Sequence, residues 1–227
     1  PLAEGEREVL LAAAGTIDGC ELKLIEDKKI LPVISQAMSV TERVALETKE
    51  LHKLFFKSIF WDAKKNSRGE SGLYIKTLEL PLPARALFKV INKWPVIKLL
   101  NIIGFNKLVA KTNAGVYSSS AAHAAIITGH KDEDFINAGR SFQRVWLEAT
   151  RLGLSIQPVA GMLYWAQKEG KKDHAPFSEA NSDLIHEAVN KMIFIFNVES
   201  SKVIAMLFRI GRADSPSARS YRKSPEI

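Results

Sequence analysis

The side chains that could ligate a metal or act as nucleophiles are few in this sequence and widely separated. The five histidines show no metal-ligand spacing, and their order builds no Cys-His or Ser-His-Asp pattern. The serine run 118–120 lacks the glycines of a nucleophile elbow, and neither GxGxxG nor a Walker sequence is present. We therefore name no catalytic side chain and no metal site, and a cofactor with its own chemistry would account for the shortage. Surface or packing roles are expected for His52, His123, His130, His174 and His186.

One segment combines a strong helical pattern with a turn that has no obvious structural role. Residues 137–161 read "NAGRSFQRVWLEATRLGLSIQPVAG". The first part predicts a helix with one apolar stripe, and Gly153 stands where a helix-ending glycine belongs. The remainder, Gln157 to Gly161, has no periodicity and predicts a turn. The stripe consists of Ala138, Phe142, Val145, Trp146, Ala149 and Leu152.

The rest of the chain contains both helical and strand patterns. Apolar spacing predicts helices over 4–14, 41–61 and 178–198, with Thr41 as the N-cap of the second. The "MIFIF" in the third could also form a strand, and we favour the helix. Strand patterns occupy 21–28, 118–129 and 202–211.

Residues 62–111 are predicted to form an insertion between these helices and strands. Glycines and prolines between 62 and 86 predict a loop of the kind that often covers sites. The basic, amphipathic stretch 87–111 predicts one or two helices broken at Pro95 and Gly104. The tail 212–227 is basic and is expected to be irregular.

Composition and charge exclude several classes of protein. Apolar residues make up 46% of the 227 and charged residues 25%, which predicts a packed domain. Lys and Arg number 32 against 25 Asp and Glu, a net charge of +7 that we interpret as a solvated basic surface spread along the chain. Lysines interrupt the most apolar stretch, so no membrane partner is expected, and no motif points to nucleic acid. The single Cys20 fits a reducing, cytoplasmic setting. A chain that begins at Pro1 without methionine is expected to be a processed or excised piece.

The stretch "GRSFQRVWLEATRLGLSIQPVAG" resembles the nitroreductase family of flavoproteins. "ELHKLFFKSIFWDAKKNSRGESGLYIKTLELP" and "AMLFRIGRADSPSARSYRKSPE" resemble a subgroup whose members include domains fused to an E1-like, ubiquitin-activating-type adenylating domain. The resemblance covers about residues 5–227. It implies one α+β domain over 1–227, with a mixed, mainly antiparallel sheet flanked by helices and a lid at 62–111.

The resemblance also implies a flavin site. Pro158, Val159, Ala160 and Gly161 would line the isoalloxazine ring of FMN, with the Ala160 and Gly161 N–H groups reaching N5 and O4. FMN ends in a phosphate, which arginine binds through a charged fork, and Arg222 and then Arg219 are the first choices in the tail. A solvated tail is the alternative.

The sequence departs from the family near its N-terminus. "GTIDGC" aligns Asp18, Gly19 and Cys20 with the family's Asp-Asn-Cys, so that glycine replaces an asparagine that contacts flavin, and the following "QPW" is absent. Asp18 and Gly19 are still the candidates for this part of the flavin site. The alternative of a degenerate family member that binds no flavin therefore stays open.

The implied function is electron transfer from NAD(P)H through FMN to a small acceptor such as a nitroaromatic or a quinone, by an intertwined homodimer. The alternative is a non-catalytic flavin-binding or scaffold domain that acts with an adenylating-enzyme partner.

Overall fold

The structure is a computed structural model that describes residues 1–67, 72–169 and 177–219, and it divides the chain into two compact units. The first unit comprises 1–42 and 108–213, and the second comprises 43–107 with the tail from 214. The second unit is thus larger than the 62–111 insertion expected from sequence.

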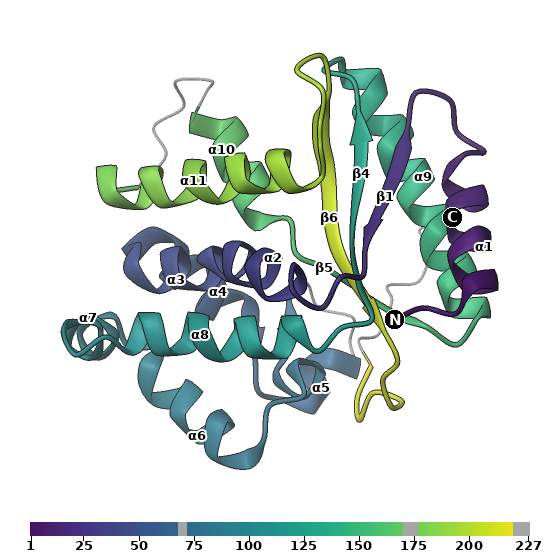
Figure 1. The fold of residues 1–227 in the computed structure, drawn as a ribbon. Helices are drawn as coiled ribbons and strands as arrows, with labels where there is room; N and C mark the ends of the chain where they lie inside the picture. The colour runs from purple at the N-terminus through teal and green to yellow at the C-terminus, as the bar shows by residue number, and fades with distance from the viewer. Residues whose placement is uncertain (68–71, 170–176, 220–227) are drawn as a thin grey trace, which may run out of the picture. The chain divides into compact units, whose positions relative to one another are not determined.

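The first unit is built on a four-stranded antiparallel sheet (Figure 1). Its strands are β1 (Glu21–Ile25), β4 (Ala122–Thr128), β6 (Val203–Gly211) and β5 (Ser155–Pro158), in the order β1-β4-β6-β5. Every residue of β4 is buried, because this strand is central and both of its faces are covered by helices. Successive side chains of a strand point to opposite faces, so β4 supplies two hydrophobic cores.

Helices cover both faces of this sheet (Figure 1). On one face, α1 (Glu4–Ala14) and α9 (Asp132–Arg151) pack against Ala124 and Ile126. On the other, α2 (Leu31–Met38), α10 (Gly161–Glu169) and α11 (Glu179–Ile195) pack against Ala125 and Ile127. The helices predicted at 4–14 and 178–198 are confirmed, as are the three predicted strands.

The helix α9 begins five residues before the predicted segment. Asp132, Glu133 and Asp134 form its first turn, where carboxylates are favoured by the positive end of the helix dipole. Asp134 also accepts a hydrogen bond from the Lys131 N–H at 2.9 Å. At the other end, Gly153 has a φ of 71° and its N–H donates to the Thr150 carbonyl, as expected for the glycine that ends a helix.

The second unit is mostly helical. It contains α4 (Lys49–Ser58), α5 (Ala63–Ser67), the 3-10 helix η1 (Ile75–Leu78), α6 (Leu82–Ile91) and α7 (Trp94–Ile102). The short strands β2 (Ile59–Phe60) and β3 (Leu73–Tyr74) pair in parallel. A cluster around Ile59, Tyr74 and Ile75 forms its core, with Phe56 and Phe88 packed against it. The residue ranges of two helices, α3 (Val40–Glu47) and α8 (Phe105–Ser118), include the positions in the sequence at which one unit ends and the other begins.

Three local predictions in this part of the chain are wrong. The helix expected over 41–61 is interrupted at Thr48, whose backbone is extended, and 59–60 is a strand because it pairs with β3. Thr41 is not an N-cap, since α3 already begins at Val40. Pro95 lies in the first turn of α7, where a missing N–H costs nothing, so the break falls before it. The break at Gly104 is confirmed, with a φ of 85°.

None of the helices in the described ranges is long and apolar enough to span a bilayer.

Candidate functional site

The segment 158–161 is a junction between a strand and a helix. Pro158 ends β5 opposite Phe208 of β6, and the Val159 N–H donates to the Leu207 carbonyl at 2.9 Å. Val159 is buried in the core formed with α10 and α11. Helix α10 begins at Gly161. The turn predicted over Gln157 to Gly161 is therefore wrong in part, because Gln157 and Pro158 pair with β6 as strand residues and Gly161 already begins α10.

Two amides of this junction are unpaired. Within the described part of the chain, neither the Ala160 N–H nor the Gly161 N–H has a hydrogen-bond acceptor. The first amides of a helix have no acceptor inside the helix and lie at the positive end of its dipole. The junction thus offers two adjacent donors to a ligand with acceptor atoms or negative charge on one edge.

Gly161 stands against Thr41 of α3. A Cβ placed on Gly161 would lie 2.6 Å from the Thr41 Cγ2, far inside van der Waals contact. The Thr41 Oγ1 is buried and has no hydrogen-bond partner within the described residues. Close packing therefore demands glycine at 161, and it leaves an unsatisfied hydroxyl beside the two unpaired amides.

A basic cavity of about 690 Å³ begins at the residue before this junction. Gln157 and Ser155 of β5 line it together with the end of β6 and the serine run at the end of α8. Its charged side chains are three cations and one carboxylate, so its potential favours an anion. The charged lining consists of Lys28, Arg209, Arg212 and Glu26.

Arg209 is a cation of this basic cavity that is held by several contacts. Its Nε donates to Gln157 Oε1 at 2.6 Å, and its Nη1 donates to the Val116 carbonyl at 3.0 Å and to Ser120 Oγ at 3.4 Å. The guanidinium also lies over the Tyr117 ring, 5.2 Å from its centre. No carboxylate among the described residues pairs with it. Arg209 is thus held in place while its charge stays available to an anion.

A buried carboxylate supports Arg209 indirectly. The Tyr117 hydroxyl donates to Glu42 Oε1, while Glu42 Oε2 is buried without a partner among the described residues. Burial raises the pKa of Glu42 above its ordinary range, and burial together with Glu42 raises the pKa of Tyr117. Burial lowers the pKa of Arg209, and Tyr117 partly offsets this. These contacts form a chain from the buried Glu42, through Tyr117 and Arg209, to Gln157 at the cavity.

Two buried histidines have packing partners. His123 of β4 donates from Nε2 to Ser35 Oγ, because that hydroxyl itself donates to the Leu31 carbonyl. His52 donates from Nε2 to the Ile91 carbonyl at 2.8 Å. Burial and the positive charge of Arg209 lower the pKa of His123 to about 4, so the ring is neutral near pH 7. The described residues hold no cluster of three metal-ligating side chains.

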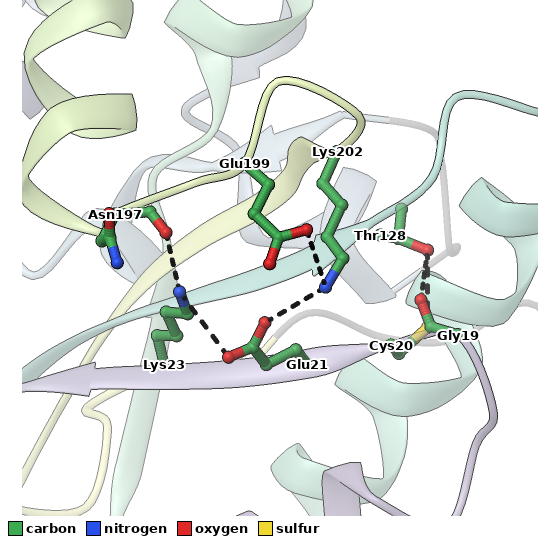
Figure 2. Close-up of polar contacts among 8 residues, drawn as sticks. All are labelled: Gly19, Cys20, Glu21, Lys23, Thr128, Asn197, Glu199 and Lys202. Atoms are coloured by element: carbon green, nitrogen blue, oxygen red, sulfur yellow. Dashed lines mark hydrogen bonds and ion pairs between the residues drawn. The ribbon is translucent and has the colours of Figure 1, made fainter.

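The structure does not bring all predicted site residues together. Asp18 and Gly19 lie in the turn before β1, and Figure 2 shows Thr128 donating to the Gly19 carbonyl there, at 3.0 Å. Since β1 and β5 are opposite edges of the sheet, this turn and the 158–161 junction are separated within one chain. Arg219 is exposed in the second unit. Arg222 lies outside the described residues.

Sequence reasoning missed the basic cavity. Arg209 is a charged residue inside the apolar strand "AMLFRIG", which is the one signal that could have found it. Thr41, Glu42 and Tyr117 carry no such signal, because their roles depend on contacts between distant segments.

Comparisons with known proteins identify the fold. No protein-family model matches the sequence. The uncharacterized protein MT1398 of Mycobacterium tuberculosis (strain CDC 1551 / Oshkosh) is 22% identical over 215 residues, which is 94% of this chain and 30% of that protein. The chain thus spans less than a third of the curated relative that it matches.

Two solved structures match with a TM-score of 0.50. An FMN-dependent nitroreductase from Clostridium difficile R20291 is 9% identical, over 100% of this chain and 88% of that chain. Oxidized iodotyrosine deiodinase bound to FMN and 3-iodo-L-tyrosine is 10% identical, over 100% of this chain and 87% of that chain. The chain therefore has the nitroreductase fold, and the predicted fold class is confirmed.

Proposed function

We propose that this chain, with its nitroreductase fold, is an FMN-dependent oxidoreductase that passes electrons from NAD(P)H through the flavin to a small acceptor such as a nitroaromatic or a quinone. The observation that carries the proposal is the pair of unpaired amides, Ala160 and Gly161, where β5 passes into α10. Flavin in two solved proteins of this fold, one described as FMN-dependent and one bound to FMN, supports it.

FMN fits the residues present at the junction. The N5 and O4 atoms of the isoalloxazine ring lie on one edge and accept hydrogen bonds, and the Ala160 and Gly161 N–H groups would hold that edge. Pro158 is exposed and would flank the ring, as the resemblance implies, whereas the Val159 side chain is buried in the core and would approach the ring only through its backbone. The buried, unpaired Thr41 hydroxyl is a further polar group beside the same amides.

We assign the phosphate end of FMN to the basic cavity. Arg209 offers a positioned guanidinium without a carboxylate partner among its described contacts, and the cavity begins next to the junction. Arg212 is a weaker candidate, because its Nη2 already pairs with Glu6 at 2.5 Å. The tail residues Arg219 and Arg222, which the resemblance assigns to the phosphate, are the competing assignment.

When bound, FMN supplies the hydride and electron transfer, and the protein supplies orientation and charge. The two amides at the start of α10 would stabilise negative charge on the ring edge through the helix dipole. Arg209 is held by Gln157, Tyr117 and the Val116 carbonyl before a ligand arrives. Binding of the phosphate would therefore cost little side-chain conformational entropy.

The proposal includes a homodimer in the cytoplasm. Because Asp18 and Gly19 lie at the opposite sheet edge from 158–161, we assign their expected flavin contact to the second copy. We retain one nitroreductase-like domain over 1–227, with 62–111 as the proposed cover of the acceptor site. The comparisons do not support fusion to an E1-like adenylating domain, and it is not part of the proposal.

The test is the visible absorption spectrum of the purified protein, before and after FMN is added and unbound FMN is removed. A retained flavin band that is bleached by NADPH or NADH without oxygen, and that returns when a nitroaromatic or quinone is added, is the expected result. A protein that retains no added FMN would contradict the proposal and leave a flavin-free scaffold. Retained flavin that neither nucleotide reduces would restrict the chain to flavin binding.

A further inference from the structure

The net positive charge of this chain comes from one stretch. Residues 80–131 contain seven lysines and arginines and no aspartate or glutamate, so the remainder of the chain has no net charge. The expectation that the surplus of +7 is spread along the chain is therefore wrong. Five of these cations are in the second unit: Arg85 and Lys89 on α6, Lys93 before α7, Lys98 on α7 and Lys107 near the start of α8.

The same helices expose large aliphatic side chains. Leu99, Ile102 and Ile103, spaced by three and four residues at the end of α7, are 67%, 78% and 80% exposed. Leu82 and Val90 of α6 are exposed as well, and α6 contacts α7. Lys89, Lys93, Lys98 and Lys107 are exposed and alternate with these residues along the sequence. We call these nine residues the α6–α7 surface.

We propose that the α6–α7 surface docks onto an anionic lipid bilayer as a peripheral contact. Exposed Leu, Ile and Val enter the boundary between head groups and acyl chains, while lysines extend their charged ends toward anionic head groups. The sequence-based expectation of no membrane partner rested on the lack of a spanning run. Peripheral docking requires no such run, and the proposal does not depend on bound flavin.

Charge and side-chain type select lipid over other occupants. A second copy docked on the same surface would bring four lysines against four lysines with no carboxylate from this stretch between them. Lysines alone can bind nucleic acid non-specifically through phosphates, but exposed aliphatic residues add nothing to such binding, since they provide neither base hydrogen bonds nor aromatic stacking. Aliphatic residues interspersed with lysine suit an anionic bilayer.

The test is co-sedimentation of the full chain with vesicles of phosphatidylcholine alone and of phosphatidylcholine mixed with phosphatidylglycerol. We expect binding only to the anionic vesicles, weakening as salt is raised. The variant Leu99→Ser/Ile102→Ser/Ile103→Ser should lower the partition constant about tenfold or more, because three apolar side chains no longer enter the bilayer. The matched control, Ile136→Ser/Leu147→Ser/Phe194→Ser, removes three exposed apolar side chains of α9 and α11 and should bind normally.

A second variant keeps the proposal testable if the serine variant folds poorly. Lys93→Gln/Lys98→Gln/Lys107→Gln should reduce binding to anionic vesicles and flatten its salt dependence. Unchanged binding by either variant, or equal binding to both vesicle types, would overturn the proposal. So would tighter binding to duplex DNA than to the vesicles, or a concentration-dependent dimer that the serine variant abolishes without any binding to lipid.

Discussion

Arg209 and Gln157 are joined by a hydrogen bond of 2.6 Å from the guanidinium Nε to the side-chain carbonyl, and this bond ties β6 to β5 one residue before Pro158. The two residues are also direct neighbours in the register of the sheet. The cation of the cavity and the start of the junction are therefore held by the same pair of strands. This arrangement makes the proposed ring and phosphate contacts testable together.

Replacement of Arg209 tests the phosphate assignment. Arg209→Ala should raise the dissociation constant of FMN about tenfold to a hundredfold, since hydrogen bonds to charged groups contribute about 1.5–3 kcal/mol. Flavin fluorescence during titration measures it, and exposed Arg144→Ala is the control. Arg209→Lys should recover only part of the affinity, because lysine keeps the charge without the fork. If Arg222→Ala weakens binding and Arg209→Ala does not, the phosphate belongs to the tail.

Replacement of Gly161 tests the close approach to Thr41. Gly161→Ala should destabilise the fold by about 1–3 kcal/mol, since its Cβ cannot fit against the Thr41 methyl. Urea unfolding measures the loss. Adding Thr41→Ser to this variant removes the methyl group and should recover part of the lost stability. Gly139→Ala in α9, where nothing lies within 4 Å of the new Cβ, should be neutral or slightly stabilising. Equal effects at the two glycines would disprove the packing argument.

The Tyr117–Glu42 hydrogen bond should show strong coupling between its partners. Tyr117→Phe leaves a buried carboxyl group without its donor and should cost about 1–3 kcal/mol in the free energy of unfolding. The double variant Tyr117→Phe/Glu42→Met should cost less than the sum of the two single variants, because neither polar partner is then left alone. Additive costs in urea unfolding would mean that the contact contributes nothing of its own.

The buried His123 should make stability fall in acid. Its pKa is lowered from 6.5 to about 4 in the folded state, so below pH 6.5 the unfolded chain binds the proton first. The contribution of His123 to the free energy of unfolding is complete above pH 6.5 and is lost as the pH falls toward 4. The loss between pH 7 and pH 5 is about 2 kcal/mol.

The comparison of His123→Gln with the wild type isolates this effect. The raised pKa of Glu42 acts in the opposite direction, favouring the folded state at low pH, and it cancels in the difference between the two proteins. Urea unfolding at pH 7 and 5 should show a smaller loss for His123→Gln, while exposed His130→Gln should behave as the wild type. Parallel losses in all three proteins would rule out His123 as the source.

The fold was predictable wherever the pattern is local. The helices α1 and α11 and the strands β4 and β6 follow from apolar spacing within each segment, because the side-chain periods of helix and strand differ. The second unit was predicted poorly. The strand at Ile59 exists because it pairs with Leu73, and such a partner cannot be read from the segment itself.

The sequence by itself determined the helices α1, α9 and α11 and the strands β1, β4 and β6 of the first unit, but not α2, β5 or α10. Its resemblance to nitroreductases pointed to residues 158–161. Only the tertiary structure decided that these residues form a strand-to-helix junction with two unpaired amides, that Thr41 requires glycine at 161, and that Arg209 faces a basic cavity. It also separated Asp18 and Gly19 from that junction within one chain. The physical reason is distance along the chain. Arg209 is 52 residues from Gln157 and 93 from Val116, and local periodicity carries no information about such contacts.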